Sequence, residues 1–163
     1  MKAVILVGHG GVPKDFPREQ VRRLKALEGQ RAAHGGAADD EERALDTRIR
    51  AWPRTAVNDP YQAGIAALAD ALRARLGDTP LVVAYNEFCA PSLDEAVAAL
   101  AGRGATSITV VPTMLTPGGS HSEIDIPQAL ASLRSRHPTL ELRYAWPVDM
   151  DLLAGMLATH LGR

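Results

Sequence analysis

Three short apolar segments constrain the fold of this chain more than any other feature. They read AVILVG at residues 3–8, LVVAY at 81–85 and SITVVP at 107–112. Each is rich in β-branched residues and lacks polar alternation, which is typical of strands buried on both faces of a parallel sheet. A fourth segment, 139–146, alternates polar and apolar residues, and we predict that it forms an edge strand.

Helical patterns separate these strands, and we predict helices over 60–76, 92–102, 121–136 and 149–161. Asp59 and Pro60 supply an N-cap and a first-turn proline for the first of them. Ser92 and Glu95 have the spacing of a capping box. One face of the first helix carries Ile65, Leu68, Leu72 and Leu76. The alternation of strands and helices predicts a three-layer α/β fold, in which helices flank a mostly parallel four-stranded sheet.

Residues 14–54 break this rhythm, because they are rich in charges of both signs. We interpret them as a charged helical insertion after the first strand, with helices over 17–33 and 41–51 joined by a flexible loop. The insertion is either a solvated hairpin or a lid or partner surface, and Trp52 and Pro53 anchor its return. With 163 residues, the chain is expected to form one domain, 1–163.

Composition excludes several classes of protein. The formal net charge of −1 provides no basic field for nucleic acid. A lone cysteine, Cys89, precludes an internal disulfide and fits a reducing compartment. No apolar run approaches the roughly 18 residues of a membrane helix. We therefore expect a cytoplasmic protein that binds neither nucleic acid nor membrane.

Reactive side chains follow the three buried strands, at their carboxyl ends. His9 follows the first strand, Glu87 the second and His121 the third. Because ligands bind outside the carboxyl ends of parallel strands, these side chains are expected to converge on one cleft. Two imidazoles and a carboxylate suit a divalent transition metal, so His9, Glu87 and His121 are the candidate catalytic and metal-binding residues. Their neighbours form the candidate substrate-binding set: Gly10, Gly11, Asn86, Gly118, Gly119 and Ser120.

His121 lies where the third strand gives way to a helix. The partial positive charge of a helix N-terminus disfavours imidazolium, so the ring is expected to be neutral and able to bind a metal or accept a proton. The backbone N–H groups of Gly118 and Gly119 are expected to receive a carboxylate or phosphate.

Each candidate also has a structural interpretation. His9 could hydrogen-bond a loop carbonyl, and Glu87 could cap an amide or pair with an arginine. Glu123 has the spacing of a capping box that begins at Ser120. Asp125, one turn beyond His121, either orients the ring or lies on the surface. Cys89 is interpreted as a small packing residue.

Other binding motifs are absent from the sequence. A dinucleotide site is disfavoured because Pro13 stands where the third glycine of the motif belongs, and no P-loop lysine-serine pair follows the glycines. No G-x-S-x-G elbow or activated nucleophile is visible, which disfavours a hydrolase. The sequence therefore predicts no nucleotide cofactor.

Three segments resemble the sirohydrochlorin chelatases of cobalamin and sirohaem biosynthesis. They are ILVGHGG at 5–11, AYNEFCAPSLDEAV at 84–97 and ITVVPTMLTPGGSHSEIDIP at 108–127. The resemblance implies a chelatase-like fold and a lyase that inserts a divalent metal into a tetrapyrrole without ATP. It assigns the histidine roles to His9 and His121 and the acidic role to Glu87. It also implies Co²⁺, Fe²⁺ or Ni²⁺ as the metal substrate and a homodimer, as in short members of the family.

The sequence departs from the family pattern after the first strand. Gly11 and Val12 replace the usual serine and the basic residue that often follows it. The alternative is a non-catalytic protein of the same fold that binds metal or tetrapyrrole.

Overall fold

The computed structural model describes residues 1–162 and has a four-stranded parallel sheet at its centre. Its strands are β1 (Lys2–Gly8), β2 (Leu81–Tyr85), β3 (Ser107–Pro112) and β4 (Glu141–Tyr144). They lie in the order β2-β1-β3-β4, so that Val7 of β1 pairs with Ala84 on one side and Pro112 on the other. The predicted parallel sheet is confirmed. The edge strand β4 is shorter than the predicted range of 139–146.

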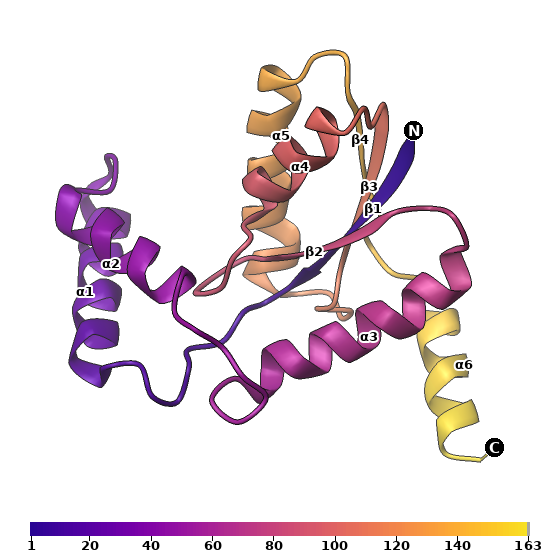
Figure 1. Cartoon of the computed structure of the whole chain (residues 1–163), viewed down its shortest axis with the longest axis horizontal. Helices are drawn as coiled ribbons and strands as arrows, with labels where there is room; N and C mark the ends of the chain where they lie inside the picture. The colour runs from indigo at the N-terminus through magenta and orange to yellow at the C-terminus, as the bar shows by residue number, and fades with distance from the viewer. Residues whose placement is uncertain (163) are drawn as a thin grey trace.

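The helices form the remaining layers. They are α1 (Arg18–His34), α2 (Asp40–Arg50), α3 (Pro60–Leu76), α4 (Leu93–Gly102), α5 (Ile126–Arg136) and α6 (Met150–His160), with a π-helical turn, η1 (His121–Asp125), before α5. In Figure 1, α4 and α5 lie on one side of the sheet and α3 on the other, while α1 and α2 stand beyond the end toward which β1 runs. The three layers and the helical insertion agree with the predicted fold.

Alternate side chains of β1 point into two different clusters. Ile5 and Val7 are fully buried against residues of α4 and α5, whereas Leu6 packs with Ile65 of α3. Burial on both faces is therefore confirmed for β1. For β3, the prediction of burial on both faces is only partly correct. Val111 is half-buried, because α3 covers mainly β2 and β1 on that face of the sheet.

Local signals set the ends of two helices as predicted. The Asp59 side chain accepts the N–H of Gln62 at the start of α3, and Ser92 and Glu95 form both hydrogen bonds of a capping box at α4. The apolar face predicted for α3 is wrong at Leu68, because this residue is 49% exposed. Ala69 is buried in its place because its small side chain lets the helix approach the sheet.

The insertion has a small core of its own. Phe16, Leu24 and Ile49 are buried together, and Trp52 packs edge-on against Phe16. The fourth buried member of this cluster is Phe88, from the loop after β2. The helical hairpin, defined here as α1 and α2, is thus packed around a residue of a strand-end loop.

At the other end of the chain, α6 buries none of its side chains, and its exposed apolar residues are Met150, Leu152, Met156 and Leu157. Among residues 1–162, no helix combines the length and the apolar character that crossing a membrane requires.

Candidate metal centre

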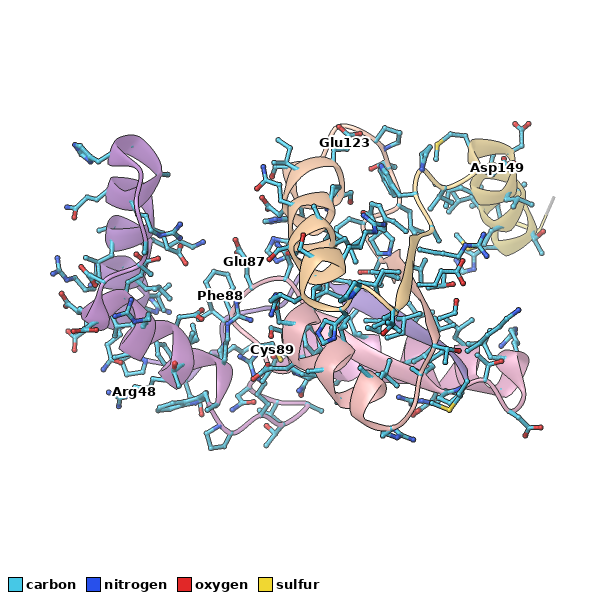
Figure 2. The ribbon with its side chains drawn as sticks, turned by 90° about the horizontal axis from the view of Figure 1, so that it is seen from above. Arg48, Glu87, Phe88, Cys89, Glu123 and Asp149 are labelled. Carbon is cyan, nitrogen blue, oxygen red and sulfur yellow. The ribbon has the colours of Figure 1, made fainter. Side chains whose placement is uncertain are left out.

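The carboxyl ends of three strands bring His9, Glu87 and His121 together. His9 follows β1, Glu87 follows β2, and His121 begins η1 after β3. One potential ligand atom from each lies within 4.8 Å of the others. All three residues are half-buried, and Figure 2 shows Glu87 and Phe88 on the loop between the helical hairpin and α5. The convergence expected from a parallel sheet is present.

Backbone hydrogen bonds fix the two loops that carry His9 and Glu87. The Asn86 N–H donates to the Gly8 carbonyl at 3.0 Å, and the Glu87 N–H donates to the His9 carbonyl at 2.8 Å. Gly10 has φ +94°, and a Cβ there would stand 1.8 Å from the Glu87 carbonyl oxygen. Glycine is needed at this position because the two loops touch, a reason independent of any substrate.

Hydrogen bonds to the Nδ1 atoms set the ring orientation of both histidines. Nδ1 of His9 lies 2.7 Å from the Gly10 carbonyl, and Nδ1 of His121 lies 2.6 Å from a carboxylate oxygen of Asp125. A carbonyl or ionised carboxylate only accepts, so each Nδ1 carries the proton and each Nε2 presents a lone pair. Nδ2 of the Asn86 amide lies 2.7 Å from Nδ1 of His121. An amide nitrogen only donates, so a protonated Nδ1 requires the amide turned by 180°, which places its oxygen at this position. Carbonyl and carboxylate partners of this kind orient metal-binding histidines.

The two Nε2 atoms face each other at 3.1 Å. This distance fits an N–H···N hydrogen bond when one ring carries its proton on Nε2, and it fits a shared cation when both Nε2 lone pairs are free. Metal–nitrogen bonds of about 2.0–2.1 Å separate two neighbouring ligand nitrogens by roughly 2.8–3.4 Å in octahedral or tetrahedral geometry. The observed spacing therefore fits two imidazoles on one ion, and Oε1 of Glu87, 4.0 Å from Nε2 of His121, is near enough to become a third ligand.

The segment before His121 differs from the sequence interpretation. Ser120 already has helical dihedral angles and makes no capping hydrogen bond, so the predicted capping box is wrong. The Glu123 carboxylate instead accepts the N–H of Gly118 at 2.8 Å. The prediction that the Gly118 N–H binds an anion of the substrate is therefore wrong, because Glu123 already occupies this N–H. Gly119 and Ser120 are exposed beside it.

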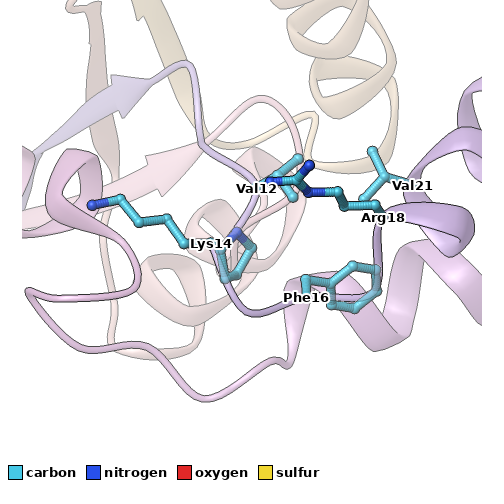
Figure 3. Close-up of a pocket in the computed structure, with 6 residues that line it drawn as sticks. Val12, Lys14, Phe16, Arg18 and Val21 are labelled. Carbon is cyan, nitrogen blue, oxygen red and sulfur yellow. The ribbon is translucent and has the colours of Figure 1, made fainter.

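Near His9, the chain lines a cavity of about 310 Å³. Figure 3 shows the Arg18 side chain reaching from α1 toward Val12, while Lys14 points the other way. Gly11 comes just before the residues that line this cavity. Its φ is not positive, and a Cβ added there would make only ordinary van der Waals contacts. The insertion thus brings one cation, the Arg18 guanidinium, to the place where Val12 replaces the basic residue of the chelatase pattern.

Four residues at this end of the sheet were not identified from the sequence. Arg54 forms an ion pair with Asp59 and donates to the Gly11 carbonyl and to Phe88. Arg50 donates to the carbonyl of Asn86 at 3.3 Å. The other two are Lys25 and Phe88. Their contacts with the loops after β1 and β2 join residues that are distant in the chain, so no local pattern could have indicated these contacts.

Cys89 lies in the same loop, but its side chain is buried against β2 and α3. Burial raises the pKa of the thiol, which disfavours the reactive thiolate. The interpretation of Cys89 as a packing residue therefore agrees with the structure.

The sequence of the chain matches the model of the CbiX family over residues 56–159. It is 28% identical to the sirohydrochlorin ferrochelatase of Bacillus subtilis strain 168 over 86 residues, which are 53% of this chain and 33% of that protein. It is 32% identical to the sirohydrochlorin cobaltochelatase of Priestia megaterium over 66 residues, 40% of this chain and 21% of the relative. The chain therefore spans a third or less of the curated relatives that it matches.

Two solved structures share the fold. A CbiX protein of cobalamin biosynthesis from Marinobacter aquaeolei VT8 aligns with a TM-score of 0.57 at 19% identity, covering 99% of this chain and 93% of that one. SirB from Bacillus subtilis with Fe³⁺ aligns with a TM-score of 0.52 at 22% identity, covering 88% and 38%. Together with the family match, they confirm the resemblance seen in the sequence: the chain belongs to the CbiX family.

Proposed function

We propose that the protein inserts a divalent metal ion, cobalt or iron, into sirohydrochlorin or a related tetrapyrrole without ATP, and that His9, Glu87 and His121 hold the incoming ion. The observation that carries the proposal is the pair of Nε2 atoms 3.1 Å apart beside the Glu87 carboxylate. Glu87 and His121 lie within the residues matched by the family model, whereas His9 precedes them.

The chemistry is an exchange of one ion for two protons. The divalent ion is a substrate, and it leaves the protein as the macrocycle loses two pyrrole N–H protons. Nε2 of His9 and Nε2 of His121 lose the ion at that moment, so each lone pair becomes free to accept one proton. Glu87, with Oε1 4.0 Å from His121, then passes protons outward to solvent. While both imidazoles hold these protons, the charge of the site equals its charge with the ion bound, and release of the protons readies it for another ion.

Substrate carboxylates require cations and backbone donors around the metal centre, because the net charge of −1 supplies no general attraction. We assign this task to Asn86, Gly119, Ser120 and the Gly10-Gly11 turn. Arg18, beside Val12 in the cavity near His9, adds a cation from the insertion.

Residues 1–163 are proposed to act as one chelatase-like unit in which the insertion completes the site. The bonds from Arg54 and the burial of Phe88 in the hairpin core support this arrangement. A cytoplasmic homodimer is proposed as the working form, with the exposed apolar side chains of α6 at its interface. Analytical ultracentrifugation tests the dimer, and a monomer at all concentrations would contradict it.

The function is tested by mixing the purified protein with sirohydrochlorin and Co²⁺ and following the tetrapyrrole absorption spectrum. Wild type accelerates insertion over the uncatalysed reaction. His121→Ala lowers the rate by roughly a hundredfold or more, because a metal ligand and proton acceptor is lost. His160→Ala removes an exposed histidine of α6 and leaves the rate unchanged. Equal rates for His121→Ala and wild type would refute the assignment, and tight cobalt binding without acceleration would identify a carrier.

A further inference from the structure

The two oxygens of the Glu87 carboxylate face different partners. Oε1 lies 4.0 Å from Nε2 of His121, on the side of the imidazole pair. Oε2 lies 3.5 Å from the ammonium nitrogen of Lys25, which belongs to α1 of the helical hairpin. The carboxylate is therefore shared between the candidate metal ligands and a lysine that lies outside the residues matched by the family model.

Further contacts position Lys25. Its ammonium nitrogen lies 4.5 Å from the centre of the Phe88 ring and 3.3 Å from a carboxylate oxygen of Glu28. Phe88 is itself buried in the hairpin core, next to the residue that carries Oε2. The hairpin thus holds Lys25 over the Glu87 loop, although the side chain is 48% exposed and retains freedom to move.

We propose that Lys25 is a positioning residue that restrains Glu87 and weakens the hold of the site on its metal ion. This inference rests on the proposed function. With Lys25 on Oε2, the carboxylate offers only Oε1 to the ion, and the ammonium repels the divalent charge. Two imidazoles with an unrestrained carboxylate would bind a late transition metal tightly. A chelatase must release its ion to the macrocycle, so a fixed positive charge beside the acidic ligand favours transfer over retention.

Titration with CoCl₂ in an isothermal calorimeter tests this role on the full chain. Lys25→Ala is expected to bind Co²⁺ about tenfold more tightly than wild type, because a repelling charge is removed and both oxygens are released. Lys25→Arg keeps the charge and stays within about twofold of wild type. Lys2→Ala, at the opposite end of β1, changes nothing and controls for the loss of a lysine.

Turnover separates this role from a merely structural one. Structural damage at Lys25 would weaken metal binding, whereas the proposal predicts tighter binding together with slower cobalt insertion at saturating tetrapyrrole. In a Glu87→Gln background, the effect of Lys25→Ala on affinity is smaller than in wild type, because only the direct repulsion of the ion remains. An equal effect in the two backgrounds would overturn the restraint of Glu87 by Lys25.

The outcomes also distinguish this inference from the proposed function. Unchanged or weaker cobalt binding by Lys25→Ala, in a protein whose binding is lost in His121→Ala, overturns the role of Lys25 and leaves the metal centre intact. A wild-type protein that binds no Co²⁺ overturns both.

Discussion

The sheet and the helical hairpin are stabilised in different ways. The main core is a continuous cluster from β1, β3, α4 and α5, with Ile5, Leu100 and Leu130 fully buried. The hairpin core is small, and one of its four buried members, Phe88, comes from the loop that carries Glu87. The sheet can complete its core from its own layers, whereas the hairpin requires the site loop. This difference makes the hairpin part of the candidate site.

The two regions are joined by Arg54, whose side chain is 5% exposed and forms a buried ion pair with Asp59. Replacing Arg54 by Met leaves the Asp59 carboxylate buried without its partner and frees the carbonyls of both strand-end loops. Loss of one member of a buried pair costs about 3–5 kcal/mol of the free energy of unfolding. Urea denaturation of Arg54→Met measures this loss. A change below about 1 kcal/mol would show that the junction is not where the regions are held together.

Matched leucine truncations compare the two cores directly. Leu130→Ala in α5 and Leu24→Ala in α1 each remove a buried side chain, at an expected cost of about 2–5 kcal/mol. Leu130→Ala lowers the global stability, because its cluster spans the sheet. Leu24→Ala is expected to act locally, so that hydrogen exchange accelerates in α1 and α2 while β1 and β3 keep their protection. Equal loss of protection in the sheet would mean that the two regions unfold as one unit.

Within the candidate metal centre, the Asp125 carboxylate lies 2.6 Å from Nδ1 of His121 and is expected to orient the ring. Asp125→Ala is expected to weaken Co²⁺ binding by about 10- to 100-fold, because the ring loses the partner that fixes its tautomer. Calorimetry measures the affinity, and Asp151→Ala in the first turn of α6 serves as the matched control. If Asp125→Ala bound Co²⁺ as tightly as wild type, Asp125 would be a surface residue that does not orient His121.

The smallest effect is expected at the half-exposed ion pair that joins α1 to α2. The Arg23 guanidinium, hydrogen-bonded to Glu41, holds the pKa of that carboxyl below its usual range. The pair therefore stabilises the fold above the usual carboxyl pKa, and its contribution is lost as pH falls through the depressed value. Both side chains are half exposed, so Glu41→Gln should leave the melting temperature at pH 7 almost unchanged, with any effect shrinking as the pH falls below the usual carboxyl pKa. A clear destabilisation at pH 7 would show that the hairpin depends on its surface charges.

Local signals made much of the fold predictable. Apolar runs located β1, β2 and β3, and the caps at Asp59 and Ser92 located the starts of α3 and α4. The parallel order of the strands was sufficient to predict that their carboxyl ends would bring the reactive side chains together.

Contacts between distant segments were not predictable. Lys25 is 62 residues from Glu87, and its place on α1 gives no sign of that partner. The Ser120 cap failed because the chain enters helical geometry one residue early and forms a π-helical turn, in which Glu123 bonds to Gly118. Tertiary geometry overrode the local pattern there.

The central claim is that His9, Glu87 and His121 bind one divalent ion. Anomalous diffraction at the cobalt edge from crystals grown with Co²⁺ tests it most directly. The account predicts a single strong peak about 2.0–2.2 Å from Nε2 of both histidines, with Oε1 of Glu87 turned toward it. Saturated crystals whose cobalt lies elsewhere, or beside only one of the two imidazoles, would contradict it.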